Sequence, residues 1–152
     1  MQRRLIFMDF RYKKWREEWG KYFLLRSYLQ VYLLQGFFMW IISIPIIVVS
    51  VATDQAISPF ILAGTIIWLI GFAFEAIGDY QLMVFIKHKK NKSDIMQTGL
   101  WKYTRHPNYF GDACTWWGIW FIACETGLPG WISIIGPIFL TFTLTRWSGK
   151  PM

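Results

Sequence analysis

Cysteine, histidine and acidic residues are all scarce in this sequence. Its 152 residues include 2 Cys and 2 His, and only 9 Asp plus Glu against 16 Lys plus Arg. Cys114 and Cys124 are ten residues apart on one expected helix, about 15 Å at the helical rise per residue, whereas a disulfide needs Cα atoms within about 7 Å. The two therefore cannot pair with each other. Without a CxxC, an HExxH or another ligand cluster, no metal site is expected.

Apolar residues, in contrast, are abundant. Hydrophobic residues make up 55% of the chain and aromatic residues 20%, which excludes an ordinary soluble surface. Crossing a bilayer takes about 20 apolar residues, and four segments are candidates: about 28–51, 59–85, 107–124 and 130–147. The third begins with polar residues and spans only if protein encloses them. We expect an all-α integral membrane protein, a bundle of four transmembrane helices with an interfacial N-terminal segment.

The basic residues predict the orientation. All sixteen precede the first segment, lie between the second and third, or lie at or beyond the end of the fourth. By the positive-inside rule, both termini and the 87–106 loop are expected in the cytoplasm, and a bacterial inner membrane and an endoplasmic reticulum fit equally well. The net charge of +7 is explained by membrane lipids with anionic headgroups, so no nucleic-acid partner is expected. Residues 1–27 are assigned to a cytoplasmic, interfacial amphipathic segment and 28–152 to the transmembrane domain.

Two of the expected membrane helices carry acidic residues, which need an explanation. Glu75 and Asp79, four residues apart in the second segment, share one face, and Asp112 lies in the third. A charge at the bilayer centre costs about 3 kcal/mol on insertion scales and marks a functional site. The alternative is that these acids anchor helix ends by pairing with basic neighbours: Lys87, Lys102 or Arg105. Elsewhere, small residues are expected to permit close helix approach: Gly36, Gly64, Gly71 and Gly78.

The third segment favours a functional site. Pro107 suits the first helical turn, which makes His106 a plausible cap. The spacing then places five residues on one face: Arg105, Asn108, Tyr109, Asp112 and Trp116. A helix N-terminus with a nearby arginine suits a phosphate, and the loop before it adds lysines. The pattern indicates a nucleotide cofactor that enters from the cytoplasm, with carboxylates binding ribose hydroxyls or an amide and cations binding phosphate.

One stretch resembles a known family. The run TGLWKYTRHPNYFGD, preceded by FEAIGDYQL, resembles the C-terminal domain of the steroid 5α-reductase superfamily, above all its bacterial-type branch of uncharacterised membrane proteins. The motif RHPNYFGD is also similar to that of the sterol C14-reductases, and the resemblance covers nearly the whole chain, making 28–152 a reductase-like domain.

The resemblance implies an oxidoreductase acting on CH–CH groups. It implies NADPH-dependent reduction of a C=C bond in a steroid-like or other lipid enone or alkene, hence a lipid-like small-molecule substrate. The cofactor-binding residues that it implies are Glu75, Asp79, Lys87, Arg105, His106, Asn108, Tyr109 and Asp112. It assigns no catalytic residue to this chain.

The family also has parts that this chain does not match. The groups that polarise the substrate carbonyl lie on helices before the region present here, and a C-terminal tail helps close the cofactor site. We therefore expect a domain truncated at both ends, with a partner chain as one source of the missing helices. An alternative is a membrane methyltransferase of the isoprenylcysteine or phospholipid type, which shares the Arg-His-Pro-x-Tyr-x-Gly run and uses S-adenosylmethionine. A second alternative is a non-catalytic membrane fragment that needs a partner chain.

Overall fold

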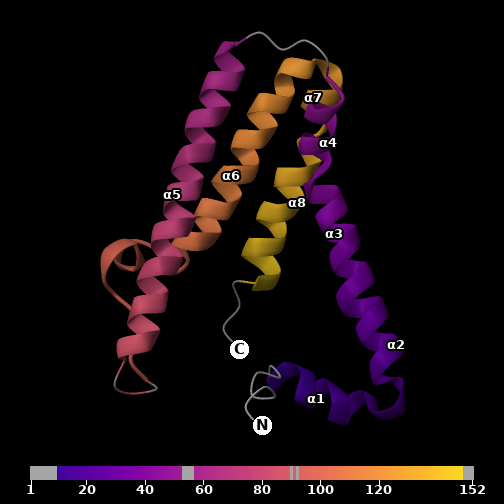
Figure 1. The fold of residues 1–152 in the computed structure, drawn as a ribbon, viewed down its shortest axis with the longest axis vertical. Helices are drawn as coiled ribbons and strands as arrows, with labels where there is room; N and C mark the ends of the chain where they lie inside the picture. The colour runs from indigo at the N-terminus through magenta and orange to yellow at the C-terminus, as the bar shows by residue number, and fades with distance from the viewer. Residues whose placement is uncertain (1–9, 53–56, 90, 92, 149–152) are drawn as a thin grey trace, which may run out of the picture. The chain divides into compact units, whose positions relative to one another are not determined.

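The computed structural model describes residues 10–52, 57–89, 91 and 93–148, and all regular structure within these ranges is helical, without a strand (Figure 1). Two compact units make up the chain, Met1–Trp40 and Ile41–Met152. They are described separately below. The predicted division at residues 27 and 28 stays a prediction.

The first unit is a series of short helices that follow one another without loops. They are α1 (Phe10–Trp19), the 3-10 turn η1 (Gly20–Tyr22), α2 (Phe23–Ser27), the π-helical η2 (Tyr28–Leu33) and most of α3 (Leu34–Ile42). The rings of Trp15 and Trp19 stack at 5.2 Å, and the Arg16 guanidinium lies 5.1 Å from the centre of the Phe23 ring. Basic side chains interleaved with aromatic rings are typical of a segment at a membrane surface. That location stays a prediction.

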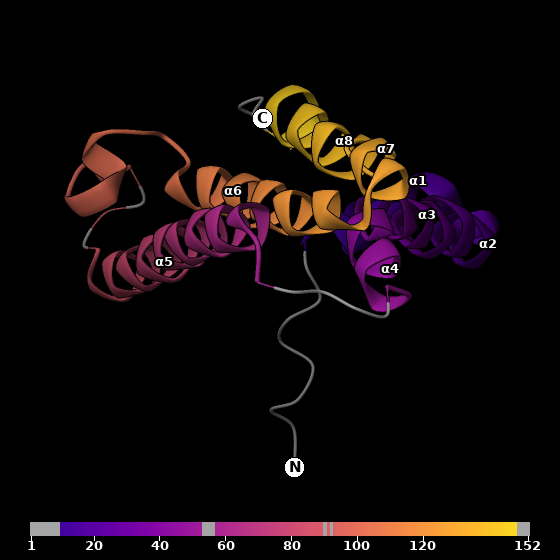
Figure 2. The same ribbon diagram turned by 90° about the horizontal axis from the view of Figure 1, so that it is seen from above.

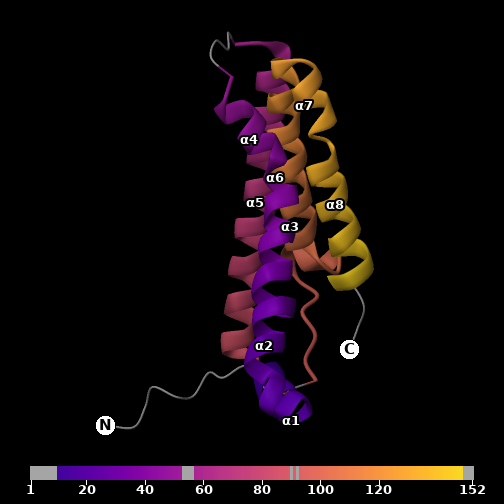
Figure 3. The same ribbon diagram turned by 90° about the vertical axis from the view of Figure 1, so that its right-hand side faces the viewer.

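The second unit contains the remaining helices. They are α4 (Ile44–Ser50), α5 (Pro59–His88), η3 (Gly99–Lys102), α6 (Pro107–Ala123), η4 (Cys124–Thr126), α7 (Leu128–Ile132), α8 (Ile135–Thr143) and η5 (Leu144–Ser148). Helix α6 lies between α5 on one side and α8 on the other (Figures 2 and 3). A small buried core forms from side chains of α6, α8 and the turns next to them: Trp120, Ala123, Cys124, Ser133, Pro137 and Leu140.

The candidate spans are fewer than the four expected. Among the described residues, Pro59–His88 and Leu128–Arg146 are long and apolar enough to cross a membrane, and Lys13–Ile42 with Ile44–Ser50 qualifies if a bent pair counts as one span. Helix α6 has only 17 residues, and its first two turns carry the polar residues Asn108 and Asp112. The structure thus supports an all-helical chain with two or three candidate spans, and the four-helix count stays a prediction.

The first expected span is interrupted at Ser43. Proline has no N–H to continue a helix and its ring crowds the preceding turn, so the chain breaks at Ser43 and a new helix, α4, begins at Ile44 with Pro45 in its first turn. Helix α8 packs against this break through Gly136, where an added Cβ would lie 2.8 Å from the Ile42 carbonyl oxygen and 3.0 Å from Pro45 Cδ. A residue without a side chain is therefore required at this crossing.

Helices α5 and α6 pack most closely, through glycines seven residues apart. A Cβ on Gly64 would lie 2.6 Å from the Gly118 oxygen, one on Gly71 would lie 2.5 Å from the Thr115 nitrogen, and one on Gly78 would lie 3.3 Å from Pro107 Cγ. The prediction of close helix approach is confirmed at these three positions. An added Cβ on the fourth predicted glycine, Gly36, meets nothing within 4 Å.

Side-chain hydrogen bonds join this pair at one end. Ser58 caps α5, its oxygen accepting from the Ile61 N–H at 3.3 Å. The same hydroxyl donates to Glu125 Oε2 at 2.5 Å, in the turn that follows α6. The end of α6 is thereby held against the beginning of α5.

Candidate cofactor site

The segment before α6 is fixed against α5 by two hydrogen bonds. The Leu100 N–H donates to Gln81 Oε1 at 3.0 Å, and the Trp101 indole donates to the Gly78 carbonyl at 3.0 Å. Gly99 has a φ of +61° and no room for a Cβ beside the Gln81 amide. These contacts determine where the polar first turns of α6 lie. They give Gln81 a structural role that the sequence could not assign.

Three carboxylates gather where α5 faces these first turns. Glu75 and Asp112 are partly buried and Asp79 is exposed, and both aspartates lie within electrostatic range of Glu75. The close approach at Gly111, whose Cβ would lie 2.5 Å from the Glu75 nitrogen, brings the two helices together here. In the described part of the chain these acids form no ion pair with the basic residues offered as the alternative partners: Lys87, Lys102 and Arg105. Pairing as helix-end anchors is therefore not what the structure shows.

Asn108 adds an amide to this group. Its Oδ1 is buried and has no hydrogen-bond partner among the described residues, and an unsatisfied buried acceptor costs about 1–3 kcal/mol. One turn further along α6, Asp112 lies within interaction range of the Trp116 indole. Together, Glu75, Asp79, Asn108 and Asp112 form what we call the acceptor cluster. It offers oxygen atoms to a ligand that donates hydrogen bonds.

The chemistry of the acceptor cluster limits the ligands that it can bind. The described residues hold no group of three side chains arranged to bind a metal ion. Carboxylates without a basic partner would repel a phosphate but accept hydrogen bonds from ribose hydroxyls or a carboxamide. The cluster therefore fits a ligand's hydroxyl or carboxamide groups better than a phosphate.

His106 and Tyr109 lie toward α8, on the side of α6 next to the acceptor cluster. Their rings stack at 4.7 Å between centroids, and both line a cavity of about 400 Å³ between α6 and the α8–η5 segment. His106 holds the cap position of α6, as predicted, but its side chain makes no capping hydrogen bond. The predicted site residues are thus divided between the α5-facing and α8-facing sides of one helix.

The two predicted phosphate ligands are solvent-facing. Lys87, in the last turn of α5, and Arg105, in the loop before α6, are both exposed. The structure does not bring either of them into the acceptor cluster. Their assignment stays a prediction.

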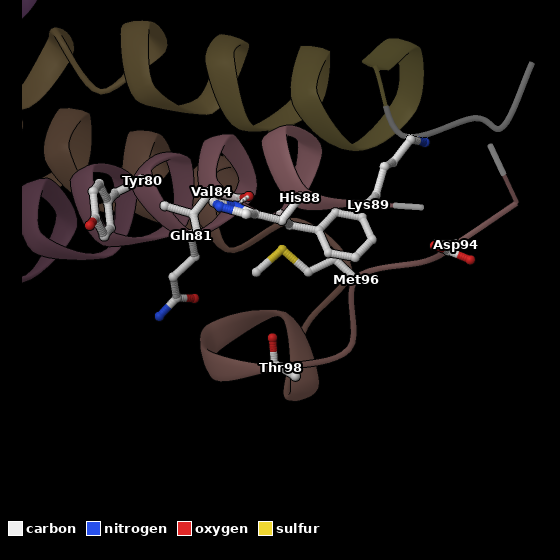
Figure 4. Close-up of a pocket in the computed structure, with 9 residues that line it drawn as sticks. Tyr80, Gln81, Val84, His88, Lys89, Asp94, Met96 and Thr98 are labelled. Carbon is white, nitrogen blue, oxygen red and sulfur yellow. Dashed lines mark hydrogen bonds between the residues drawn. The ribbon is translucent and has the colours of Figure 1, made fainter. Parts of the chain in front are cut away.

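A second cavity lies beside the last turns of α5 (Figure 4). It measures about 450 Å³ and is lined by Tyr80, Gln81, Val84, Phe85, His88, Lys89, Asp94, Met96 and Thr98. His88 Nδ1 bonds the Val84 carbonyl at 2.8 Å, and because a carbonyl only accepts, the ring nitrogen carries the proton. His88 did not stand out in the sequence, where it lies among lysines. The four-residue spacing of Tyr80, Val84 and His88 along one helix face was the available signal.

Comparison with known protein families shows which family this chain belongs to. Residues 3–152 match the family described as "Protein of unknown function (DUF1295)". The chain belongs to this family. The family is related to the steroid 5α-reductases, as the resemblance implied.

Curated relatives agree with this assignment. The chain is 31% identical over 93 residues to 3-oxo-5-alpha-steroid 4-dehydrogenase 1 of Mus musculus, covering 61% of this chain and 33% of the relative. The enzyme of the same name from Rattus norvegicus is 31% identical over 94 residues, covering 62% and 33%, and that from Bos taurus 27% over 99 residues, covering 65% and 38%. The chain thus spans about a third of the length of these relatives. No solved structure gave a significant match.

Proposed function

We propose that this chain is a membrane-embedded, NADPH-dependent reductase of a C=C bond in a steroid-like or other lipid enone or alkene. Its relatives include dehydrogenases named for 3-oxo steroids, which supports the reaction class. The observation that carries the proposal is the acceptor cluster with its unpartnered Asn108 oxygen. Bound NADPH would supply the hydride.

Each polar residue has a role in this proposal. Asn108 Oδ1 would accept from the nicotinamide carboxamide, which satisfies the buried oxygen. Asp79, Asp112 and Glu75 would accept from ribose hydroxyls. Arg105 and Lys87, exposed at the same end of α5 and α6, would bind phosphates, where a guanidinium and a lysine are both effective. His106 and Tyr109 would border the nicotinamide, and the cofactor would enter from the side predicted to be cytoplasmic.

A methyltransferase is the second candidate. Three acids without an ion-pair partner in the described residues would also stabilise the sulfonium cation of S-adenosylmethionine and bind its ribose. The same cluster therefore serves either cofactor, and a direct competition separates them. A non-catalytic role, or a partner chain that completes the enzyme, would leave both ligands unbound.

The test is energy transfer from the protein's ten Trp to NADPH in the detergent-purified chain. Asp112→Asn keeps the size of the side chain and removes its charge, and Asn108→Leu removes the acceptor. We expect saturable NADPH binding that each variant weakens about tenfold, or about 1.4 kcal/mol. Excess S-adenosylmethionine should leave the signal unchanged.

The matched control is Glu17→Gln, which removes an exposed carboxylate on α1 and should leave NADPH binding intact. Loss of the signal on adding S-adenosylmethionine would transfer the assignment to the methyltransferase. Binding that is equal in wild type, Asp112→Asn and Asn108→Leu would show that the cofactor lies elsewhere.

A further inference from the structure

The cavity beside the last turns of α5 (Figure 4) has no part in the cofactor assignment. One wall is the end of α5, and the other is the loop that follows it, through Asp94, Met96 and Thr98. Its volume of about 450 Å³ falls within the range of about 300–1,000 Å³ found for small-molecule sites. Because its wall residues are not those of the acceptor cluster, a ligand here is independent of the proposed reductase function.

The position of this cavity along α5 places it at a membrane surface. Helix α5 is a candidate membrane span of 30 residues, which is about 45 Å at the helical rise per residue, whereas the hydrocarbon core of a bilayer is about 30 Å thick. The ends of α5 therefore reach the headgroup regions. The cavity extends from Lys89, the C-cap of the helix, back to Tyr80, and so runs from the headgroup region toward the hydrocarbon.

One end of the cavity carries charges of both signs. Figure 4 shows Lys89 and Asp94 at the end away from Tyr80. The Lys89 N–H donates to the Phe85 carbonyl at 2.8 Å, and Asp94 Oδ2 accepts from the Asn91 N–H at 3.0 Å. The backbone that carries the ammonium and the carboxylate itself are thus both held by hydrogen bonds.

His88 adds a hydrogen-bond acceptor to this end. Its Nδ1 donates to the Val84 carbonyl at 2.8 Å, which fixes the orientation of the ring. In a neutral imidazole whose Nδ1 carries the proton, Nε2 is an acceptor. The cavity thus offers one cation, one carboxylate and one neutral acceptor to a ligand.

The rest of the cavity is largely apolar and continues into the bilayer. Its middle is formed by Val84 and Phe85 of α5 and Met96 of the loop. Along α5, Val84, Tyr80 and Ile77 follow one another at helical spacing on one face and are 38%, 63% and 48% exposed. A charged end that leads into an exposed apolar row matches the layout of a phospholipid, with its headgroup in the cavity and its acyl chains along the helix.

We infer that this cavity binds the headgroup of phosphatidylethanolamine, with the phosphate at Lys89 and the primary ammonium at Asp94 and His88 Nε2. The ammonium has three N–H donors for these two acceptors, and each charge of the headgroup meets one of opposite sign. Phosphatidylcholine lacks N–H donors. An anionic lipid such as phosphatidylglycerol would bring a net negative charge next to the Asp94 carboxylate without an ammonium to balance it.

A headgroup bound in this way also joins the loop to α5. Gln81, a wall residue, accepts a hydrogen bond from the Leu100 N–H at 3.0 Å, so the cavity lies beside the contact that positions the start of α6. We expect hydrogen–deuterium exchange of residues 93–104 in nanodiscs to be slower with phosphatidylethanolamine than with phosphatidylcholine. Equal exchange in the two lipids would contradict a headgroup held between helix and loop.

Lipid selectivity is the direct test. Native mass spectrometry of the delipidated full chain, released from detergent micelles, would compare phosphatidylethanolamine, phosphatidylcholine and phosphatidylglycerol with identical dioleoyl chains. We expect a Kd for phosphatidylethanolamine at least about tenfold lower than for the other two. Equal affinities, or a preference for phosphatidylglycerol, would overturn the inference. Displacement by an equal concentration of glycerophosphoethanolamine would show that the ligand is a soluble zwitterion rather than a lipid.

Asp94→Asn keeps the size of the side chain and removes its charge. It should reduce the affinity for phosphatidylethanolamine to that for phosphatidylcholine, because the ammonium loses its counter-charge. The matched control is Glu17→Gln, which removes an exposed carboxylate on α1 and should leave the preference intact. A preference that persists in Asp94→Asn would show that the ammonium lies elsewhere.

Val84→Trp fills the cavity and should weaken phosphatidylethanolamine binding at least about tenfold. The matched control is Ile86→Trp, two residues further along α5, which is 58% exposed and lies outside the cavity wall, so it should bind as the wild type does. If circular dichroism shows that Val84→Trp is unfolded, Thr98→Trp fills the cavity from the loop. Wild-type affinity in a folded cavity variant would contradict the inference.

Discussion

The two sides of α6 differ in how they are packed. Toward α5, glycines bring backbone against backbone, with an added Cβ at Gly71 only 2.5 Å from the Thr115 nitrogen. Toward α8, larger side chains separate the helices and leave a cavity of about 400 Å³. In a bilayer, small residues at an interface allow the van der Waals contact that holds helices together. One side of α6 is thus built to hold its position and the other to leave space.

Because of this difference, the two sides of α6 are suited to different kinds of ligand. The acceptor cluster lies on the closely packed side, where Glu75 and Asp112 are set by the crossing at Gly111. A ligand that needs defined hydrogen bonds benefits from such a rigid frame. On the looser side, the hydroxyls of Thr141 and Thr145 already donate to backbone carbonyls. This side is therefore suited to a ligand recognised by shape. Four changes test the contrast, in decreasing order of expected effect.

Among these four changes, Gly71→Ala should produce the largest loss of stability. Its methyl group would meet the Thr115 nitrogen at 2.5 Å and the Gly111 oxygen at 2.7 Å, and because both are backbone atoms the helices must move apart. We expect the free energy of unfolding, measured by SDS titration in mixed micelles, to fall by about 3 kcal/mol. Gly36→Ala, which adds the same methyl where nothing lies within 4 Å, should be neutral or stabilising by up to about 1 kcal/mol. Equal losses in the two variants would contradict close packing at Gly71.

Only the α5 side of this interface could be predicted from the sequence. Gly64, Gly71 and Gly78 recur every seven residues on α5, so their common face was predictable. Their partners on α6, Gly111 and Gly118, were not singled out, because nothing in their local sequence says which helix opposes them. The contact between the two rows of glycines is seen only in the structure, where α5 and α6 pack together.

The candidate site could also be predicted only in part. The acids of α5 and α6 stood out because charges are costly in a membrane, and the start of α6 at Pro107 followed from proline's preference for the first helical turn. The unpartnered Asn108 oxygen and the cavity beside His106 depend on contacts between distant segments. The interruption at Ser43 was missed, because a proline in a membrane helix is compatible with both a kink and a break.

Ser58→Ala should have the next largest effect. It removes the cap of α5 and the hydrogen bond to Glu125 that joins the α5–α6 pair at this end. Loss of a helix cap costs about 1 kcal/mol, and the same SDS titration measures it. Ser50→Ala is the control, since that hydroxyl bonds only the Ile47 carbonyl within its own helix and its loss should change stability by less than about 0.5 kcal/mol. A loss at Ser50 as large as at Ser58 would show that the Glu125 contact contributes nothing.

A smaller effect is expected from the hydrogen bond that joins α6 to α8. The Trp117 indole donates to Thr141 Oγ1 at 3.1 Å, and such bonds between membrane helices contribute about 0.6 kcal/mol on average. A double-mutant cycle with Trp117→Phe and Thr141→Val isolates this coupling, because the lost Thr141 bond to Pro137 cancels between the two Thr141 variants. A coupling above about 2 kcal/mol would mean that the α8 side is as firmly held as the α5 side.

The smallest change should come from Ala113→Leu, two residues after Gly111 on the same helix. Ala113 faces the cavity, so three added carbons occupy empty space, and we expect the free energy of unfolding to stay within about 1 kcal/mol of wild type. Gly111→Leu is the matched comparison, because its side chain would begin 2.5 Å from the Glu75 nitrogen and should prevent the two helices from packing. Both variants add a leucine side chain within one helical turn, so length, hydrophobicity and membrane depth are nearly equal between them. If Ala113→Leu were as destabilising as Gly111→Leu, the space beside α8 would be closed in the folded protein, and the contrast between the two sides of α6 would not exist.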